Sequence, residues 1–112
     1  MRFLTLVLLL LTTPAHAQNV FLLYNQWEQM PKAFREMYVA GAFDTLSTVA
    51  TAEQVTLAKH YNECVAKARL SMSQLTENMK EYADAQPDLQ SKPTPGALLR
   101  YLISLCGTPK PQ

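Results

Sequence analysis

The chain contains only two cysteines, Cys64 and Cys106, and whether they are joined decides how its 112 residues can fold. A bond between them closes a segment of about 43 residues, which by chain entropy stabilises a fold by about 4 kcal/mol. That is a large fraction of the roughly 5–15 kcal/mol by which a whole domain is stable. A catalytic redox pair would instead place its cysteines close together, as in C-x-x-C, so the spacing favours a structural disulfide.

An oxidising location for this disulfide is indicated by residues 1–17. Arg2 supplies a positive start, residues 3–11 are apolar apart from Thr5, and residues 14–17 end in the small-x-small pattern that signal peptidase recognises. A membrane anchor is the alternative, but this apolar run is about half as long as a bilayer-spanning helix. We therefore expect residues 1–17 to be a cleaved signal peptide and the protein to be periplasmic, where two cysteines pair.

Composition excludes several classes of function. The chain has the length of one domain and a formal charge of +1, with no basic stripe that could bind nucleic acid. Once residues 1–17 are removed, nine basic residues balance nine acidic residues, and His60 is the only histidine. We do not expect the protein to bind a membrane after cleavage. Few residues of the types that form catalytic sites remain.

Four segments show apolar residues at helical spacing. They span residues 32–49 after Pro31, residues 51–68, residues 72–85 and residues 94–106. Helix starts are indicated by Thr51, by the Ser71/Gln74 capping box and by Thr94-Pro95, and a helix end by Gly107. The predicted fold is an all-α, small four-helix bundle in residues 32–107, stapled by one disulfide. Residues 18–31 form an arm or short helix whose aromatic rings dock on the core, and residues 108–112 form a disordered tail.

The first helix carries three specific expectations. Its buried face is predicted to comprise Phe34, Met37, Tyr38, Gly41, Phe43, Leu46 and Val49. Glycine within a helix costs roughly 1 kcal/mol against alanine, so Gly41 predicts the close approach of a neighbouring helix. Asp44 lies on this apolar side and is expected to be buried and paired with Arg35, Lys67 or Arg69.

No catalytic, cofactor-binding or metal-ligating residue is expected. His60 and Cys64 lie four residues apart and would form half of a metal site or a Cys-His dyad, but Cys64 has an obvious partner and no second histidine remains. We expect His60 to be a surface or half-buried polar residue. Met72 and Met79 are interpreted as core, with an adaptable binding surface as the alternative.

Residues 84–93 form the longest predicted loop, which is polar and contains Pro87 and Pro93. The preceding helix presents Glu77, Lys80, Glu81 and Asp84 on the face opposite its apolar side, which indicates solvent.

Several of these features together resemble the Rap/Tai family of type VI secretion immunity proteins. They are the run Tyr38-Val39-Ala40-Gly41-Ala42-Phe43-Asp44, the helical Cys64, the stretch from Leu70 to Leu75, the helix end from Tyr82 to Pro87, and a leucine-rich last helix containing Cys106. The resemblance covers roughly residues 34–107. In the family an aromatic-proline pair commonly precedes the last cysteine, whereas Ser104 and Leu105 do so here.

The resemblance implies a periplasmic protein that binds a cell-wall amidase toxin and blocks its active-site cleft, often as a homodimer. It implies structural roles for Tyr38, Gly41 and Asp44, with Gly41 permitting close helix packing and Asp44 fixing a local polar contact. The inhibitory segment would correspond to residues 84–92. Its candidate contacts are Asp84, Gln86, Asp88, Gln90 and Lys92.

A second class of function stays open beside this one. A periplasmic stress or chaperone-like helical protein without catalytic activity would have a similar size and similarly separated cysteines. Such a chaperone would respond to acid by protonating carboxylates, and here the nine carboxylates are balanced by nine bases.

Overall fold

The computed structural model describes residues 21–48 and 51–111. The predicted signal peptide, Val49 and Gln112 lie outside the described residues. Within the described part, Thr108–Pro111 has no regular secondary structure.

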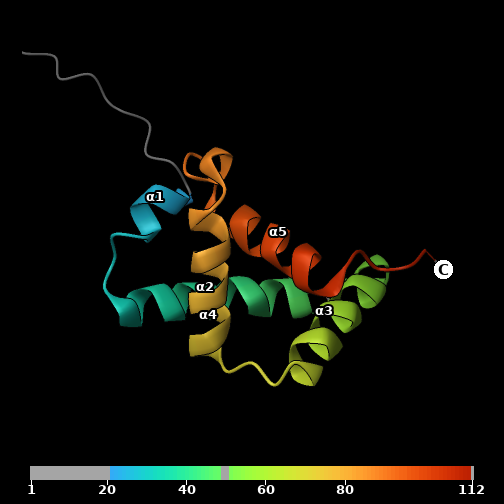
Figure 1. Ribbon diagram of the computed structural model, residues 1–112. Helices are drawn as coiled ribbons and strands as arrows, with labels where there is room; N and C mark the ends of the chain where they lie inside the picture. The colour runs from blue at the N-terminus through green and yellow to red at the C-terminus, as the bar shows by residue number, and fades with distance from the viewer. Residues whose placement is uncertain (1–20, 49–50, 112) are drawn as a thin grey trace, which may run out of the picture.

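The described chain is all-α, as predicted (Figure 1). Four longer helices, α2 (Lys32–Ser47), α3 (Val55–Lys67), α4 (Met72–Asp84) and α5 (Thr94–Cys106), follow a short helix, α1 (Tyr24–Trp27). Two single-turn 3-10 helices, η1 (Ala52–Gln54) and η2 (Pro87–Leu89), lie in the connections before α3 and α5. The predicted N-terminal arm therefore does contain an extra short helix.

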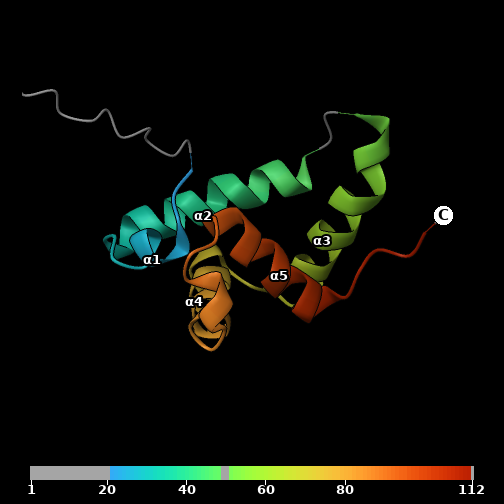
Figure 2. The same cartoon turned by 90° about the horizontal axis from the view of Figure 1, so that it is seen from above.

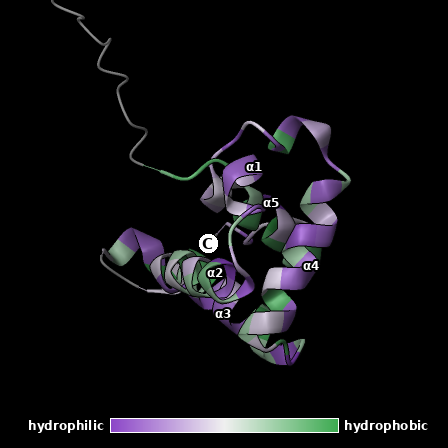
Figure 3. Cartoon of the chain, turned by 90° about the vertical axis from the view of Figure 1, so that its left-hand side faces the viewer, coloured by the Kyte–Doolittle hydropathy of each residue, from purple (hydrophilic) through white to green (hydrophobic). Residues whose placement is uncertain are grey.

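Helix α5 is the centre of the fold, because it contacts α1, α2, α3 and α4 (Figures 2 and 3). Its side chains Ala97, Leu98 and Leu102 are fully buried. Met79 of α4 is also fully buried and Met72 is partly buried, so the core interpretation of the methionine pair is confirmed.

Helix termini follow the sequence signals with one exception. Ser71 caps α4 as predicted: its hydroxyl accepts a hydrogen bond from the Gln74 amide at 3.1 Å, and the Gln74 side chain accepts one from the Ser71 amide at 2.9 Å. Gly107 ends α5 with a φ of 72°, which favours glycine. The exception is Thr94, which is the first residue of α5 instead of its cap. Its hydroxyl donates to the carbonyl oxygen of Leu22 at 2.9 Å.

The predicted buried face of α2 is wrong in its first half. Phe34 and Met37 are 45% and 75% exposed, whereas Val39 and Phe43 on the other side are buried. Tyr38, Ala42 and Leu46 pack partly against the core. Both sides of this helix carry apolar residues at spacings of three and four, so spacing alone could not identify the side that faces the core.

The expectations for Gly41 and Asp44 are also wrong. A Cβ atom built on Gly41 would have nothing within 4 Å, so no neighbouring helix approaches it. Asp44 is exposed and forms no ion pair with Arg35, Lys67 or Arg69 within residues 21–48 and 51–111. Both residues lie on the side of α2 that the fold leaves uncovered, which removes the physical basis of both expectations.

The predicted disulfide is present. Cys64 of α3 and Cys106 at the end of α5 are bonded, with their Cα atoms 5.8 Å apart. The bond fixes the last turn of the central helix to α3, so it joins the two ends of the 43-residue segment that contains α4.

Replacing Gly41 by alanine should raise the free energy of unfolding by about 0.5–1 kcal/mol, because alanine is the better helix former and its Cβ meets open space. Replacing Gly107 by alanine should lower it by about 1 kcal/mol, because of its positive φ. Urea unfolding in dilute solution measures both changes. Equal effects of the two substitutions would contradict this account of α2.

Candidate functional site

The connection between α4 and α5, residues 85–93, is an anchored loop. Leu89, in η2, is 1% exposed and belongs to the core. The Gln90 side-chain amide donates to the Ala83 carbonyl oxygen at 3.3 Å. The predicted loop between these helices is therefore confirmed, but its polar composition did not predict that a buried leucine in η2 fixes its middle to the core.

The N-terminal arm holds this loop from the other side. The amide of Tyr24 donates to the carbonyl oxygen of Lys92 at 2.9 Å, and the amide of Asn25 donates to that of Gln90 at 3.1 Å. The Thr94 amide returns a bond to the carbonyl oxygen of Leu22 at 2.9 Å. Three main-chain hydrogen bonds thus join segments about 70 residues apart and hold the backbone of the loop in one conformation.

A polar cluster lies where the arm meets the end of α4. The Tyr24 hydroxyl donates to the Asp84 carboxylate at 2.7 Å, and the Lys80 ammonium donates to the other carboxylate oxygen at 2.7 Å. Glu28 lies 3.9 Å from Lys80. The positions of Lys80 and Asp84 on α4 indicated that both side chains face solvent. Instead, both side chains take part in this polar cluster.

This cluster shifts the titration of its members. Partial burial acts to raise the pKa of Asp84, but the hydrogen bonds from Lys80 and Tyr24 outweigh it and hold that pKa below its usual value. Burial, with a smaller contribution from Asp84, raises the pKa of the Tyr24 hydroxyl. The cluster therefore keeps an ionised carboxylate and a neutral phenol at neutral pH.

Trp27 fixes the arm to α2. Its ring is fully buried, 5.4 Å from the Tyr24 ring between centroids. Its indole N–H donates to the carbonyl oxygen of Arg35 at 3.3 Å, and the Arg35 guanidinium lies 5.6 Å from the ring centroid. Tyr24 and Trp27 of the arm dock on the core as predicted, whereas Phe21, the third aromatic residue of the arm, is 48% exposed.

The five predicted partner contacts do not form one uniform surface. Asp88 and Lys92 are exposed, and Asp88 pairs with Arg100 of α5. Gln86 and Gln90 are half-buried, and the Asp84 carboxylate is held by Tyr24 and Lys80. Of the five, Asp88 and Lys92 present exposed charged groups that a partner could contact while the hydrogen bonds of Asp84 and Gln90 stay in place.

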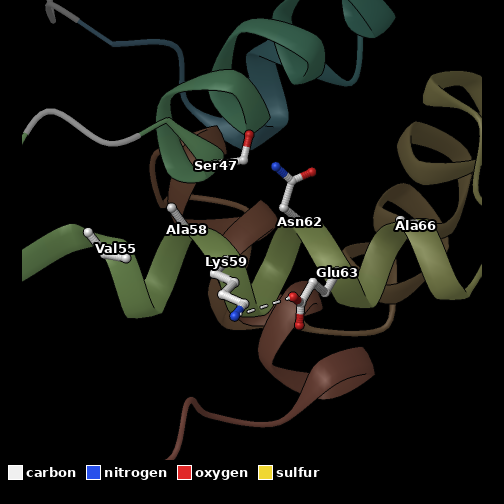
Figure 4. A pocket seen from close by; sticks show the side chains of 7 residues that line it. All are labelled: Ser47, Val55, Ala58, Lys59, Asn62, Glu63 and Ala66. Atoms are coloured by element: carbon white, nitrogen blue, oxygen red, sulfur yellow. Dashed lines mark ion pairs between the residues drawn. The ribbon is translucent and has the colours of Figure 1, made fainter. Parts of the chain in front are cut away.

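A hollow of about 440 Å³ lies between the end of α2 and α3, and Figure 4 shows the side chains that line it. Lys59 and Glu63 on its α3 side form an ion pair at 3.8 Å, and both side chains are mostly exposed. Its other lining residues are Ser47, Val55, Ala58, Asn62 and Ala66. These lining groups provide no nucleophile with a neighbouring base, so the hollow offers no catalytic arrangement.

His60 lies beside the disulfide and is half-buried. Its Nε2 atom is 2.9 Å from the carbonyl oxygen of Gly107, and its ring packs edge-on against Tyr61. This contact helps to hold the end of α5. Within the part of the chain that the structure describes, no group of three residues could hold a metal ion.

Comparison of the chain with protein-family models, with curated proteins and with solved structures gives no match. Among residues 21–48 and 51–111, no helix is long and apolar enough to cross a membrane.

Replacing Asp84 by asparagine should lower the free energy of unfolding by about 0.5–1 kcal/mol at pH 7, allowing for solvent screening of a partly exposed group. Because folding lowers the pKa of Asp84, its contribution is present at neutral pH and is lost as pH falls below about 4. The difference from the unchanged protein should therefore shrink between pH 5 and 3.

Denaturant unfolding across this pH range measures the effect. Glu77→Gln, on the exposed side of the same helix, is the matched control and should change stability by less than about 0.5 kcal/mol at every pH. A pH-independent cost of Asp84→Asn would contradict the role given to the ionised carboxylate.

Proposed function

We propose that the protein is a periplasmic binding protein of the immunity type, which inhibits a type VI secretion peptidoglycan amidase by occluding its active-site cleft. The observation that supports this proposal best is the anchored α4–α5 loop, which presents charged side chains on a backbone held by Leu89, Gln90 and the arm. The leader-like residues 1–17, the disulfide and the resemblance to the Rap/Tai family agree with it.

An anchored loop suits occlusion for an energetic reason. A flexible loop that enters a cleft must lose conformational entropy on binding, about 0.5–1.5 kcal/mol for each side chain immobilised. The α4–α5 loop is already ordered by contacts inside its own protein. Less of the favourable energy of its contacts with the amidase would therefore be offset by a loss of entropy. A few central contacts would then suffice for tight binding.

The chemistry of the loop favours a polar cleft. Asp88 offers an exposed carboxylate, and Arg100 of α5 pairs with that carboxylate and orients it. Lys92 adds a positive charge toward the start of α5. In the cleft of a Cys-His amidase, Asp88 would face groups able to donate hydrogen bonds, and Lys92 would contact an acidic rim.

The test is inhibition of a Cys-His peptidoglycan amidase encoded beside this gene. Asp88→Ala combined with Lys92→Ala should weaken binding at least 10-fold and restore hydrolysis of peptidoglycan by the amidase. Glu81→Ala, on the exposed side of α4, is the matched control and should leave binding within about 3-fold. Calorimetry and a peptidoglycan-release assay measure both quantities.

Inhibition that survives the double substitution would exclude the loop as the inhibitory segment. Absence of binding to any such amidase would contradict the proposed function itself.

The chaperone-like alternative is favoured by one observation, the position of Asp84 between α4 and the arm. Protonation of Asp84 would remove the ionic acceptor of the Tyr24 hydroxyl, and loss of the arm would uncover Trp27. Binding of an apolar dye that rises between pH 7 and 3, together with prevention of aggregation of unrelated proteins, would support this alternative over inhibition.

A further inference from the structure

The disulfide borders an open hollow on the surface of the protein. Cys64 and Cys106 are both partly exposed, and both line a hollow of about 470 Å³ where the last turn of α5 meets the end of α3 (Figure 1). The other side chains at this hollow are His60, Glu63, Lys67, Ala68 and Leu105. A disulfide sealed in a core can be reached only after unfolding, whereas this disulfide adjoins solvent in the folded chain.

The charges around the hollow favour a thiolate at Cys64 over one at Cys106. Lys67 lies three residues after Cys64 on the same side of α3 and forms no ion pair with another described residue. Its ammonium opposes the helix dipole, which disfavours an anion in the last turns of α3. Glu63 also lines the hollow, but Lys59 lies 3.8 Å from its carboxylate and offsets its charge. The last turn of α5, which contains Cys106, has no basic residue.

We propose that the Cys64–Cys106 bond is a site of thiol–disulfide exchange in the folded protein, open to a small thiol. The thiolate attacks the Sγ atom of Cys106, and a new disulfide forms between the attacking sulfur and Cys106. The bond to Cys64 breaks, and its electron pair leaves on the Cys64 sulfur as a thiolate on the side of α3 that contains Lys67. The attacking thiol is oxidised and Cys64 is reduced, so the step requires no other oxidant or reductant.

Exchange would free the end of α5 and leave its start in place. The buried side chains of α5 and the hydrogen bond from Thr94 to the arm do not involve the disulfide. Neither does the contact of 2.9 Å between His60 and the carbonyl oxygen of Gly107, which keeps the last turn near α3. The Cys64 thiolate therefore stays close to Cys106, where it can displace the added thiol and restore the bond. The modification is reversible and does not depend on the proposed inhibition.

Reduction kinetics distinguish attack on the folded protein from attack on an unfolded form. The full chain is recovered oxidised, treated with about 1–50 mM dithiothreitol near pH 8, and analysed by mass after alkylation. The rate should rise in proportion to the thiolate concentration and stay within about 2-fold when urea is added below the unfolding transition. A rate that stops rising with dithiothreitol, or that rises steeply with urea, shows that unfolding comes first and overturns the inference.

Two exposed alanines near the end of α3 test the role of the hollow. Ala68 lines the hollow at the disulfide, whereas Ala66 lines the separate hollow of Figure 4. Ala68→Phe should lower the rate constant of reduction about 5-fold or more, because the ring obstructs access to the sulfur atoms. Ala66→Phe, the matched control, should leave it within about 2-fold. Equal rate constants for the two variants overturn the inference. A loss of stability cannot imitate the expected result, since it would speed reduction and not slow it.

Lys67→Gln tests the charge beside Cys64. It should lower the rate constant about 3-fold or more at low salt, because the ammonium stabilises the departing thiolate. Lys32→Gln removes the same charge from an exposed position on α2 and should leave the rate constant within about 1.5-fold. Raising the ionic strength should bring the unchanged protein toward the rate of Lys67→Gln, since salt screens this interaction. Equal rates for the two lysine variants contradict the proposed leaving group.

The direction of attack is tested with glutathione, which has one thiol. After an acid quench, peptide mapping should find glutathione bound to Cys106 and the free thiol at Cys64. Glutathione found on Cys64 overturns the assigned direction. Because all of these measurements are made without any amidase, their outcomes are independent of the inhibition test.

Discussion

The insertion of Tyr24 and Trp27 into the core is the interaction on which the other contacts of this fold depend. These two fully buried rings belong to a four-residue helix that could not persist alone. Trp27 bonds to the backbone of α2, Tyr24 bonds to Asp84 at the end of α4, and the adjoining backbone bonds to the α4–α5 loop. One short segment thus connects three parts of the chain that are distant in sequence.

The order of the α4–α5 loop is a consequence of that insertion. Without the arm, the carbonyl oxygens of Gln90 and Lys92 would lose their partners. The loop would then be held by Leu89 in the core, by the Gln90 side chain on α4 and by the pair of Asp88 with Arg100. The disulfide acts at the opposite end of α5, where Cys64 and His60 hold the last turn. The central helix is therefore fixed at both ends by contacts of different kinds, and the loop that precedes it inherits a defined position.

Sequence patterns predicted those features that depend on neighbouring residues in the chain. Local chemistry predicted the cap at Ser71, the helix end at Gly107 and the helical class. The pairing of the cysteines followed from their number, since the chain has only two. Patterns failed where the outcome depends on packing between distant segments. Leu89 is one apolar residue in a polar stretch, and nothing local shows that it is buried. Likewise, no spacing rule shows that the Asp84 carboxylate would meet a tyrosine 60 residues earlier.

The wrong prediction of the buried face of α2 has a different cause. The apolar residues of α2, which the spacing assigned to one face, lie on two sides of the helix, and a chain this short has too few other helices to cover both. The fold buries Val39 and Phe43 and leaves Met37 in solvent, although exposing a large apolar side chain forgoes about 1.5–3 kcal/mol of burial. Local spacing therefore cannot decide which side of α2 is buried, because that choice depends on the side to which α3, α4 and α5 pack.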